Sequence, residues 1–226
     1  MLRRTVLKNN LFKKPSNTSK VYLITNQVFS ALTHGIGFIL AAIGTIMLLV
    51  KAAHQSNTVG IISYSIYGFT LMFLYLCSTL FHSLYFTKAR HVFQILDHSS
   101  IFLLIAGTYT PFCLLGMPKP MGPILLTIIW LITIGGIIYK IFNVGNHPVI
   151  DTILYVAMGW MVIIGMKPLH AVLGNTGILL LFLGGVSFTI GALLYVMKGI
   201  KYIHVIWHMF VMLGTAFMFF SVYFYL

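Results

Sequence analysis

The stretch VFSALTHGIGFILAAIGTIMLLV occupies residues 28–50 and contains no Lys, Arg, Asp or Glu. As an α-helix it would rise about 35 Å, which is enough to cross a hydrocarbon core about 30 Å thick. A strand of a membrane β-barrel would show about ten residues of alternating polarity, whereas this run is continuously apolar. The stretch therefore predicts a transmembrane α-helix.

The rest of the chain repeats this pattern. Hydrophobic residues make up 59% of the 226 residues and charged residues only 7%, whereas soluble domains are about one quarter charged. Polar or turn-forming breaks divide the chain into seven apolar runs. We expect an all-α integral membrane protein, a seven-helix bundle of the plasma membrane, bacterial in type, with spans near 28–50, 59–86, 92–115, 121–142, 147–167, 173–197 and 203–226.

The distribution of Lys and Arg predicts the orientation. With seven spans and a cytoplasmic N-terminus, eleven of the fourteen basic residues lie on the inner side, and only Lys51, Lys119 and Lys167 lie outside. The positive-inside rule therefore favours a cytoplasmic N-terminus and an external C-terminus. Residues 1–27 form a basic cytoplasmic tail and residues 28–226 the transmembrane domain. We expect the tail to lie on anionic inner-leaflet lipid, so the net charge of +12 needs no nucleic-acid partner.

This topology brings polar residues of separate spans to one depth. The chain has only two carboxylate side chains, Asp97 and Asp151. Ionisable groups are expensive to bury at membrane depth, so they indicate a functional site. The predicted spans bring one set of polar residues into the inner leaflet: His34, Ser78, His82, Asp97, His98, His204 and His208.

Spacing adds a second constraint to this cluster. His204 and His208 are four residues apart, so both rings project from one face of a helix. Together with a histidine from a neighbouring helix they would form the three-nitrogen set typical of catalytic zinc, with the leftover carboxylate outside that set. An HxxxH pair is a weak signal by itself. Intramembrane histidines also serve as plain hydrogen-bonding contacts between helices, and other divalent ions suit three imidazoles.

Longer motifs in the same segments resemble a known family. Ser78-xxx-His82, the run Asp97-His98-Ser99-Ser100-Ile101 continuing to Ala106-Gly107-Thr108-Tyr109-Thr110-Pro111-Phe112, and His204-xxx-His208 resemble the hemolysin III branch of the progestin and adipoQ receptor family. The resemblance covers nearly the whole chain from Thr33 onward. It implies a seven-helix bundle with a cytoplasmic N-terminus and a zinc ion near the inner leaflet.

The resemblance also implies a role for each residue that matches a motif. His82, His204 and His208 match the zinc ligands of the adiponectin receptors, and Asp97 matches an aspartate that contacts the zinc-bound water. Ser78 matches the serine four residues before the first ligand. One motif differs: the first helix of this branch has a glutamate and an asparagine where this chain has Gln27 and Ser30. The acidic residue of that motif is therefore missing here, and the ligand set does not include it.

Three functions follow as hypotheses. The first is a zinc-dependent hydrolase of an amide or ester bond in a membrane lipid, such as a ceramide-like substrate, with Asp97 and Ser78 as catalytic residues. The second is a pore-forming or cytolytic protein, as the hemolysin name implies. The spans, however, show no charged stripe that would line an aqueous pore. The third is a sensor of membrane state or a receptor with structural zinc. The sequence defines neither the substrate nor the oligomeric state.

Overall fold

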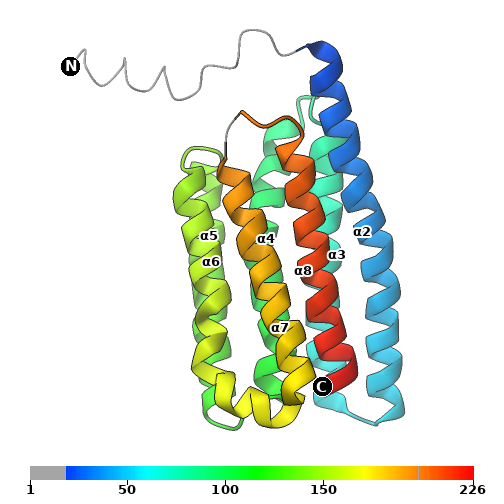
Figure 1. The fold of residues 1–226 in the computed structure, drawn as a ribbon, viewed down its shortest axis with the longest axis vertical. Coiled ribbons are helices and arrows are strands. Elements are labelled where there is room, and N and C mark those ends of the chain that lie inside the picture. The colour runs from blue at the N-terminus through cyan, green and yellow to red at the C-terminus, as the bar shows by residue number, and fades with distance from the viewer. Residues whose placement is uncertain (1–18, 198) are drawn as a thin grey trace, which may run out of the picture.

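The computed structural model describes residues 19–197 and 199–226, and in this part of the chain every element is a helix. The helices run up and down along the long axis of a bundle (Figure 1). Their bounds are α2 Lys20–His54, α3 Thr58–Ser83, α4 Arg90–Leu115, α5 Met121–Asn143, α6 Pro148–Trp160, a 3₁₀ helix η1 Met161–Gly165, α7 Met166–Val196 and α8 Ile203–Tyr225.

Local sequence explains where several helices begin. The Ser19 hydroxyl accepts a hydrogen bond from the backbone N–H of Tyr22 at 3.2 Å, and the Asn57 side chain accepts one from Gly60 at 2.8 Å. Such caps satisfy backbone N–H groups that have no partner inside a helix. Helix α2 begins at Lys20, two turns before the predicted span. The predicted basic tail, residues 1–27, falls mostly on residues 1–18, which lie outside the described residues.

Six helical stretches of the described chain are long and apolar enough to cross a membrane. One of them is the 49-residue stretch Pro148–Val196, which comprises α6, η1 and α7. Gly174 interrupts it with a φ of 62°, in the left-handed region that glycine adopts readily. Because α6 also packs against α7, the chain doubles back within this stretch. The all-α membrane class is confirmed, whereas the number of crossings and the orientation stay predictions.

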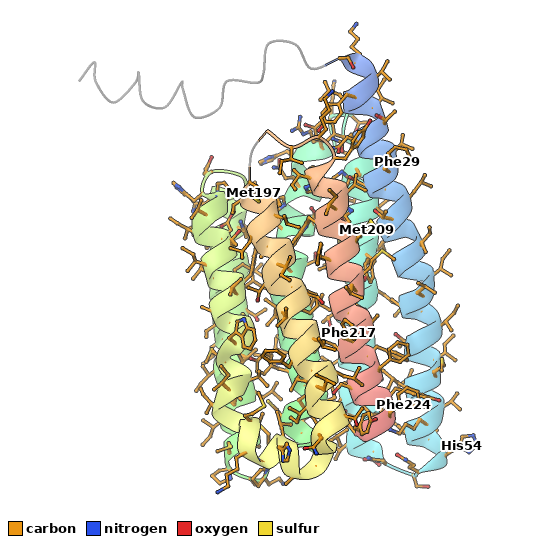
Figure 2. All side chains as sticks on the ribbon, viewed as in Figure 1. Phe29, His54, Met197, Met209, Phe217 and Phe224 are labelled. Carbon is orange, nitrogen blue, oxygen red and sulfur yellow. The ribbon has the colours of Figure 1, made fainter. Side chains whose placement is uncertain are left out.

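Contacts between helices from the two ends of the described chain close the bundle. Helix α2 packs against α3 and also against α8, so the first and last helices of the described chain are neighbours (Figure 1). The outward faces are apolar, as a lipid-facing surface requires. Figure 2 shows three such side chains, Phe29, Met209 and Phe224, which are 49%, 60% and 63% exposed.

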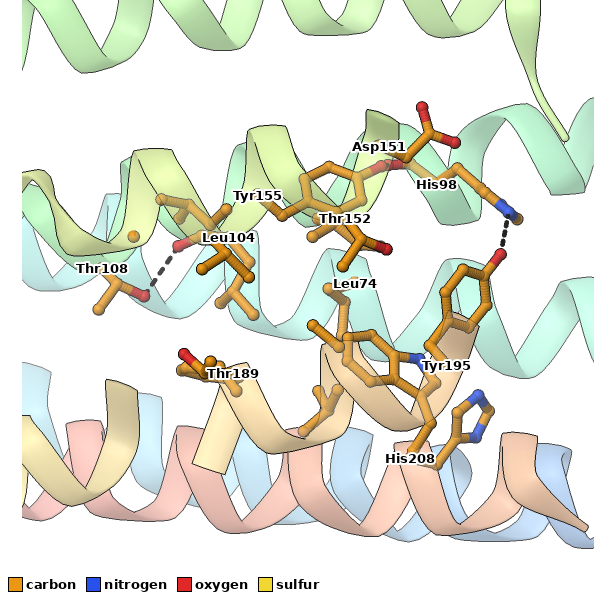
Figure 3. A pocket seen from close by; sticks show the side chains of 18 of the residues that line it. Leu74, His98, Leu104, Thr108, Asp151, Thr152, Tyr155, Thr189, Tyr195 and His208 are labelled. Atoms are coloured by element: carbon orange, nitrogen blue, oxygen red, sulfur yellow. Dashed lines mark hydrogen bonds between the residues drawn. The ribbon is translucent and has the colours of Figure 1, made fainter. Parts of the chain in front are cut away.

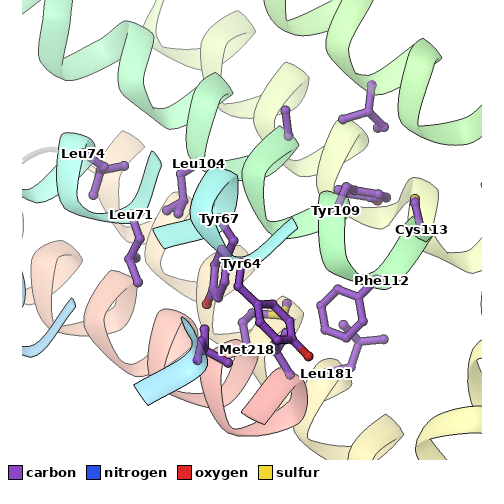
Figure 4. Close-up of a cluster of buried hydrophobic side chains, with 14 of the residues drawn as sticks. Tyr64, Tyr67, Leu71, Leu74, Leu104, Tyr109, Phe112, Cys113, Leu181 and Met218 are labelled. Carbon is purple, nitrogen blue, oxygen red and sulfur yellow. The ribbon is translucent and has the colours of Figure 1, made fainter. Parts of the chain in front are cut away.

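The interior is packed with aromatic and branched side chains. Tyr64 and Tyr67 of α3 are almost completely buried, and Phe112 of α4 lies in the same cluster (Figure 4). Leu181 from α7 and Met218 from α8 complete this contact between four helices. Because lipid tails are as apolar as these side chains, close packing and buried hydrogen bonds hold the helices together.

Candidate metal centre

Three predicted histidines meet at the end of the bundle where α2 begins. His82 lies in the last turn of α3, whereas His204 and His208 lie in the first two turns of α8. One ring nitrogen from each histidine lies within 4.8 Å of the other two. His82 and His208 are buried and His204 is half-buried. The described chain therefore contains a buried three-histidine group that could hold a metal ion.

The nitrogens that face one another are identified by their distances. Nε2 of His82 and Nε2 of His204 are 3.1 Å apart. The ring of His208 is centred 5.0 Å from that of His82 and 4.7 Å from that of His204. Tetrahedral zinc with Zn–N bonds of 2.0–2.1 Å holds its nitrogens about 3.3 Å apart, so the approach of His82 to His204 fits such an ion.

In two of these rings the nitrogen that points away from the group, Nδ1, is hydrogen-bonded to a residue of α2. Nδ1 of His82 lies 2.6 Å from Oε1 of Gln27, and Nδ1 of His208 lies 3.2 Å from the carbonyl oxygen of Ser30. Both oxygens can only accept, so each Nδ1 must carry the proton. The Nε2 lone pairs of His82 and His208 are then free for a metal ion. This donor set fits zinc, since neutral imidazole is a usual zinc ligand.

A largely apolar cavity adjoins the histidines. Its volume is about 130 Å³, and His204 and His208 line it together with Asp97 and Ser78. Figure 3 shows His98, Tyr155, Tyr195 and His208 around this space. The apolar lining includes Leu74, Ile101, Leu104, Ile105, Val156, Phe188, Val211 and Met218.

The two predicted catalytic residues lie in this cavity but outside the converging histidine group. Among the described residues that group contains the three histidines and no carboxylate. Asp97 is 14% exposed at its side chain and lies 3.5 Å from Nδ1 of His98. The Oγ of Ser78 is buried, and its polar neighbour in the cavity is the Asp97 carboxylate. Both groups therefore line the cavity side by side.

His98 is held in the cavity wall by its own contacts. Its Nδ1 lies 2.9 Å from the carbonyl oxygen of Gln94 and must donate to it, and its Nε2 lies 3.5 Å from the hydroxyl of Tyr195 (Figure 3). The hydroxyl of Tyr155 donates to the carbonyl oxygen of His98 at 2.9 Å. These contacts fix the turn of α4 that presents Asp97.

His34 supports the site without joining the ligand group. Its ring stacks on that of His208 with a centroid separation of 3.5 Å and an interplanar angle of 10°. Tyr75 contacts His34 edge-on and is itself bonded through its hydroxyl to Thr215 at 2.6 Å. The predicted convergence of His34 with His208 is therefore present, but as a packing contact.

A second polar pair borders the cavity near His98 (Figure 3). Lys140 of α5 forms an ion pair with Asp151 of α6, and the two side chains are 0% and 4% exposed. Asp151 also lines the cavity. Sequence reasoning did not pair these residues, although an isolated Lys and Asp facing each other across two adjacent predicted spans could have suggested it. It also did not detect the hydrogen bond that His82 donates to Gln27, because only the tertiary structure places these two side chains of α3 and α2 together.

Fold and site together define a polytopic α-helical membrane protein with a three-histidine group beside an apolar cavity. The family model described as "Haemolysin-III related" matches residues 22–219, and the chain belongs to this family. It is 43% identical over 205 residues to "Hemolysin-3 homolog" of Bacillus subtilis (strain 168), covering 91% of this chain and 96% of that protein.

Two further relatives place the chain within the wider group. It is 42% identical over 208 residues to "Hemolysin-3" of Bacillus cereus, covering 92% of this chain and 95% of the relative. It is 28% identical over 167 residues to "Monocyte to macrophage differentiation factor" of Homo sapiens, covering 71% and 69%. The predicted family is therefore confirmed. The chain is a multi-pass membrane protein, and the Bacillus relatives support the predicted bacterial cell membrane.

Proposed function

We propose that this protein is a zinc-dependent hydrolase that cleaves an amide or ester bond of a membrane lipid, with a ceramide-like molecule as the model substrate. The observation that supports it most is that two members of the three-histidine group, His204 and His208, line a cavity together with Asp97 and Ser78. Such a set contains a metal-binding group, an acid–base group and a hydroxyl, which together suit hydrolysis of a carbonyl compound.

Each residue has a distinct part in this proposal. His82, His204 and His208 would hold the ion, which when bound supplies Lewis acidity and lowers the pKa of water. The Asp97 carboxylate would accept a proton from the attacking water and later deliver it to the leaving group. The Ser78 hydroxyl, which is buried and lines the cavity beside Asp97, would orient the water or donate to the developing oxyanion.

The cavity wall supports a lipid as the substrate. Apolar side chains such as Leu74, Leu104 and Val211 make up most of its lining. They would exclude water around an acyl chain, whereas Asp97 and Ser78 line the cavity together with His204 and His208. A substrate that stays in the bilayer could therefore place its scissile carbonyl beside the metal group while its chain occupies the apolar part.

The proposed topology has seven crossings, with the N-terminus cytoplasmic and the C-terminus external. The stretch Pro148–Val196 would cross twice, because 49 helical residues would rise about 74 Å and the chain doubles back within it. The basic residues then divide eleven to three in favour of the inner side, and the histidines lie in the inner leaflet. Reporter fusions at Leu226 test this topology: an active cytoplasmic reporter there would overturn both the span count and the leaflet.

Metal content and lipid cleavage, measured on the same purified preparations, test the enzymatic proposal. We expect one zinc per chain and cleavage of a ceramide-like lipid in vesicles, both lost in His82→Ala. His91→Ala removes an exposed histidine and is the matched control, so it should keep both properties. Bound zinc with no cleavage of any lipid amide or ester would instead favour a sensor or receptor in which zinc is structural.

A cytolytic function is the second candidate, because two relatives are named as hemolysins. The cavity argues against an aqueous pore, since its lining is mostly apolar and Asp151, which lines it, is paired with the buried Lys140. Dye release from vesicles separates the two functions. Release that persists in Asp97→Asn and in His82→Ala would favour cytolysis over hydrolysis.

A further inference from the structure

Helix α2 contributes none of the three candidate ligands, yet it contacts two of them from behind. Gln27 meets His82, while Ser30 and Thr33 meet His208. Figure 1 shows the reason: α2 lies alongside both α3 and α8, the two helices that bear the histidines. Among these contacts, the one from Gln27 is the shortest, at 2.6 Å, and it joins two buried side chains.

We propose that Gln27 is a positioning residue that fixes the orientation and the tautomer of His82 and thereby sets the metal affinity of the three-histidine group. Oε1 of Gln27 accepts the Nδ1 proton of His82, so the Nε2 lone pair is directed at Nε2 of His204, 3.1 Å away. Without this acceptor, the proton could move to Nε2 and block the nitrogen that faces the site. Partners of this kind commonly change metal affinity 10–100-fold.

The burial of Gln27 strengthens this assignment. Its side chain is 8% exposed, so few water molecules could replace the amide as a partner of His82. His208 has two acceptors, the carbonyl oxygen of Ser30 and the hydroxyl of Thr33, each 3.2 Å from its Nδ1. For Nδ1 of His82, Gln27 is the one hydrogen-bonding partner found among the described residues, whereas Nε2 faces His204.

An amide at this position also sets the charge of the site. With three neutral imidazoles, an ionised Asp97 and a divalent ion, the assembled group has a net charge of about +1. A carboxylate at position 27 would bring that sum to zero and would be a stronger acceptor for the Nδ1 proton. The structure therefore predicts that Gln27→Glu binds zinc at least as tightly as the natural chain.

The test measures zinc affinity by competition with a chelator of known affinity, on full-length protein in detergent or nanodiscs. Gln27→Met removes the acceptor at similar size and should weaken binding 10–100-fold. Gln27→Glu should restore it or exceed it. Asn26→Leu removes an amide from the adjacent position of α2 that does not contact His82, and should leave affinity unchanged. The electronic spectrum of the Co²⁺-loaded protein should change in Gln27→Met and not in Asn26→Leu.

This inference rests on the metal site of the proposed function but not on turnover, so the two can fail separately. Zinc binding by Gln27→Met equal to that of the natural chain would overturn the role of Gln27 and leave hydrolysis intact. If Gln27→Met does not fold, the zinc affinity of Gln27→Glu tests the role of Gln27. Weaker zinc binding by Gln27→Glu than by the natural chain would contradict the proposal. If the natural chain binds no zinc, both the role of Gln27 and the zinc hydrolase are wrong.

Discussion

The position of one proton on each imidazole determines what the candidate site can bind. Acceptor oxygens of Gln27 and Ser30 hold the protons on Nδ1 of His82 and His208, which leaves both Nε2 atoms as lone-pair donors. Asp97 lies in the cavity wall and outside the group of converging nitrogens. Substitution of a histidine ligand is therefore expected to remove the metal, whereas substitution of Asp97, the proposed base, is expected to remove lipid cleavage and leave the metal bound.

Asp97→Asn tests this separation. We expect the variant to keep most of its bound metal, because the three nitrogens remain, and to lose lipid cleavage, because an amide cannot accept the proton of water. General-base catalysis typically contributes 10²–10⁴-fold, so the loss in rate should be of that order. Metal stoichiometry and lipid cleavage are measured on the same preparations, with His82→Ala expected to lose both.

Two results would contradict this assignment of Asp97. Release of metal from Asp97→Asn as complete as from His82→Ala would make Asp97 a direct ligand. Full cleavage activity in Asp97→Asn would remove it from the catalytic mechanism altogether.

The sequence was informative about individual residues where spacing and depth restricted the choices. The four-residue spacing of His204 and His208 placed both on one face, and the predicted spans brought His82 to the same depth, as the structure shows. The partner of His82 could not be predicted in this way. Gln27 and His82 are 55 residues apart and on different helices, so their contact depends on the lateral rotation of α2 against α3.

At the scale of helices, close approach at small residues determines how α3 and α4 pack. A Cβ added at Gly107 of α4 would lie 1.8 Å from the hydroxyl oxygen of Thr70 of α3. Thr70 is buried, and its hydroxyl already donates to the carbonyl oxygen of Tyr67 at 2.9 Å. The threonine side chain therefore cannot move aside without breaking that bond.

Gly107→Ala should consequently destabilise the bundle by about 1–3 kcal/mol, the usual cost of overpacking. The matched control is Gly135→Ala on the exposed face of α5, where an added Cβ meets nothing within 4 Å. That change should be neutral or slightly stabilising, since alanine favours helix over glycine by up to about 1 kcal/mol. Thermal unfolding in detergent compares the two, and equal melting temperatures would show that α3 and α4 can separate without cost.

The ion pair of Lys140 and Asp151 connects α5 to α6. Both side chains are buried, so removing one partner leaves an uncompensated charge in a medium of low polarity. Asp151→Ala should therefore destabilise the protein strongly, by about 3–5 kcal/mol. The double variant Lys140→Met with Asp151→Leu replaces the pair with apolar side chains and should recover much of that loss. If the losses of stability in Lys140→Met alone and in Asp151→Leu alone simply add in the double variant, the two residues are not directly coupled.

At the scale of the whole molecule, composition and run length predicted an all-helical membrane protein, and the structure confirms it. The break between two of the predicted spans, 147–167 and 173–197, is where prediction from sequence was weakest. There the described chain forms α6, a 3₁₀ turn and α7 with a left-handed Gly174, in place of two uniform helices joined by a loop. The sequence indicates a break there, since Lys167, Pro168 and His170 interrupt the apolar run, but it does not indicate that the residues of the break are themselves helical.

The candidate metal group connects helices that are far apart in sequence. His82 belongs to α3, and His204 and His208 belong to α8, so an ion bound by all three would join the second and last helices of the described bundle. An ion that binds the folded arrangement and not separated helices stabilises it by mass action. The gain is about 2.7 kcal/mol when the free ion is at 100 times its Kd.

Chelation should therefore lower the melting temperature of the natural chain, and it should barely change that of a variant with His204→Ala and His208→Ala. A variant with His54→Ala and His91→Ala removes two exposed histidines that lie outside the group, so it should respond to chelation as the natural chain does. Thermal unfolding of all three proteins, with and without chelator, separates a metal bridge from a general loss of imidazoles. The contrary result is that chelator lowers the melting temperature of the natural chain and of the His204→Ala, His208→Ala variant equally. That result would mean that the histidines are ordinary contacts between α3 and α8, because a variant without the ligands has no metal bridge for the chelator to remove.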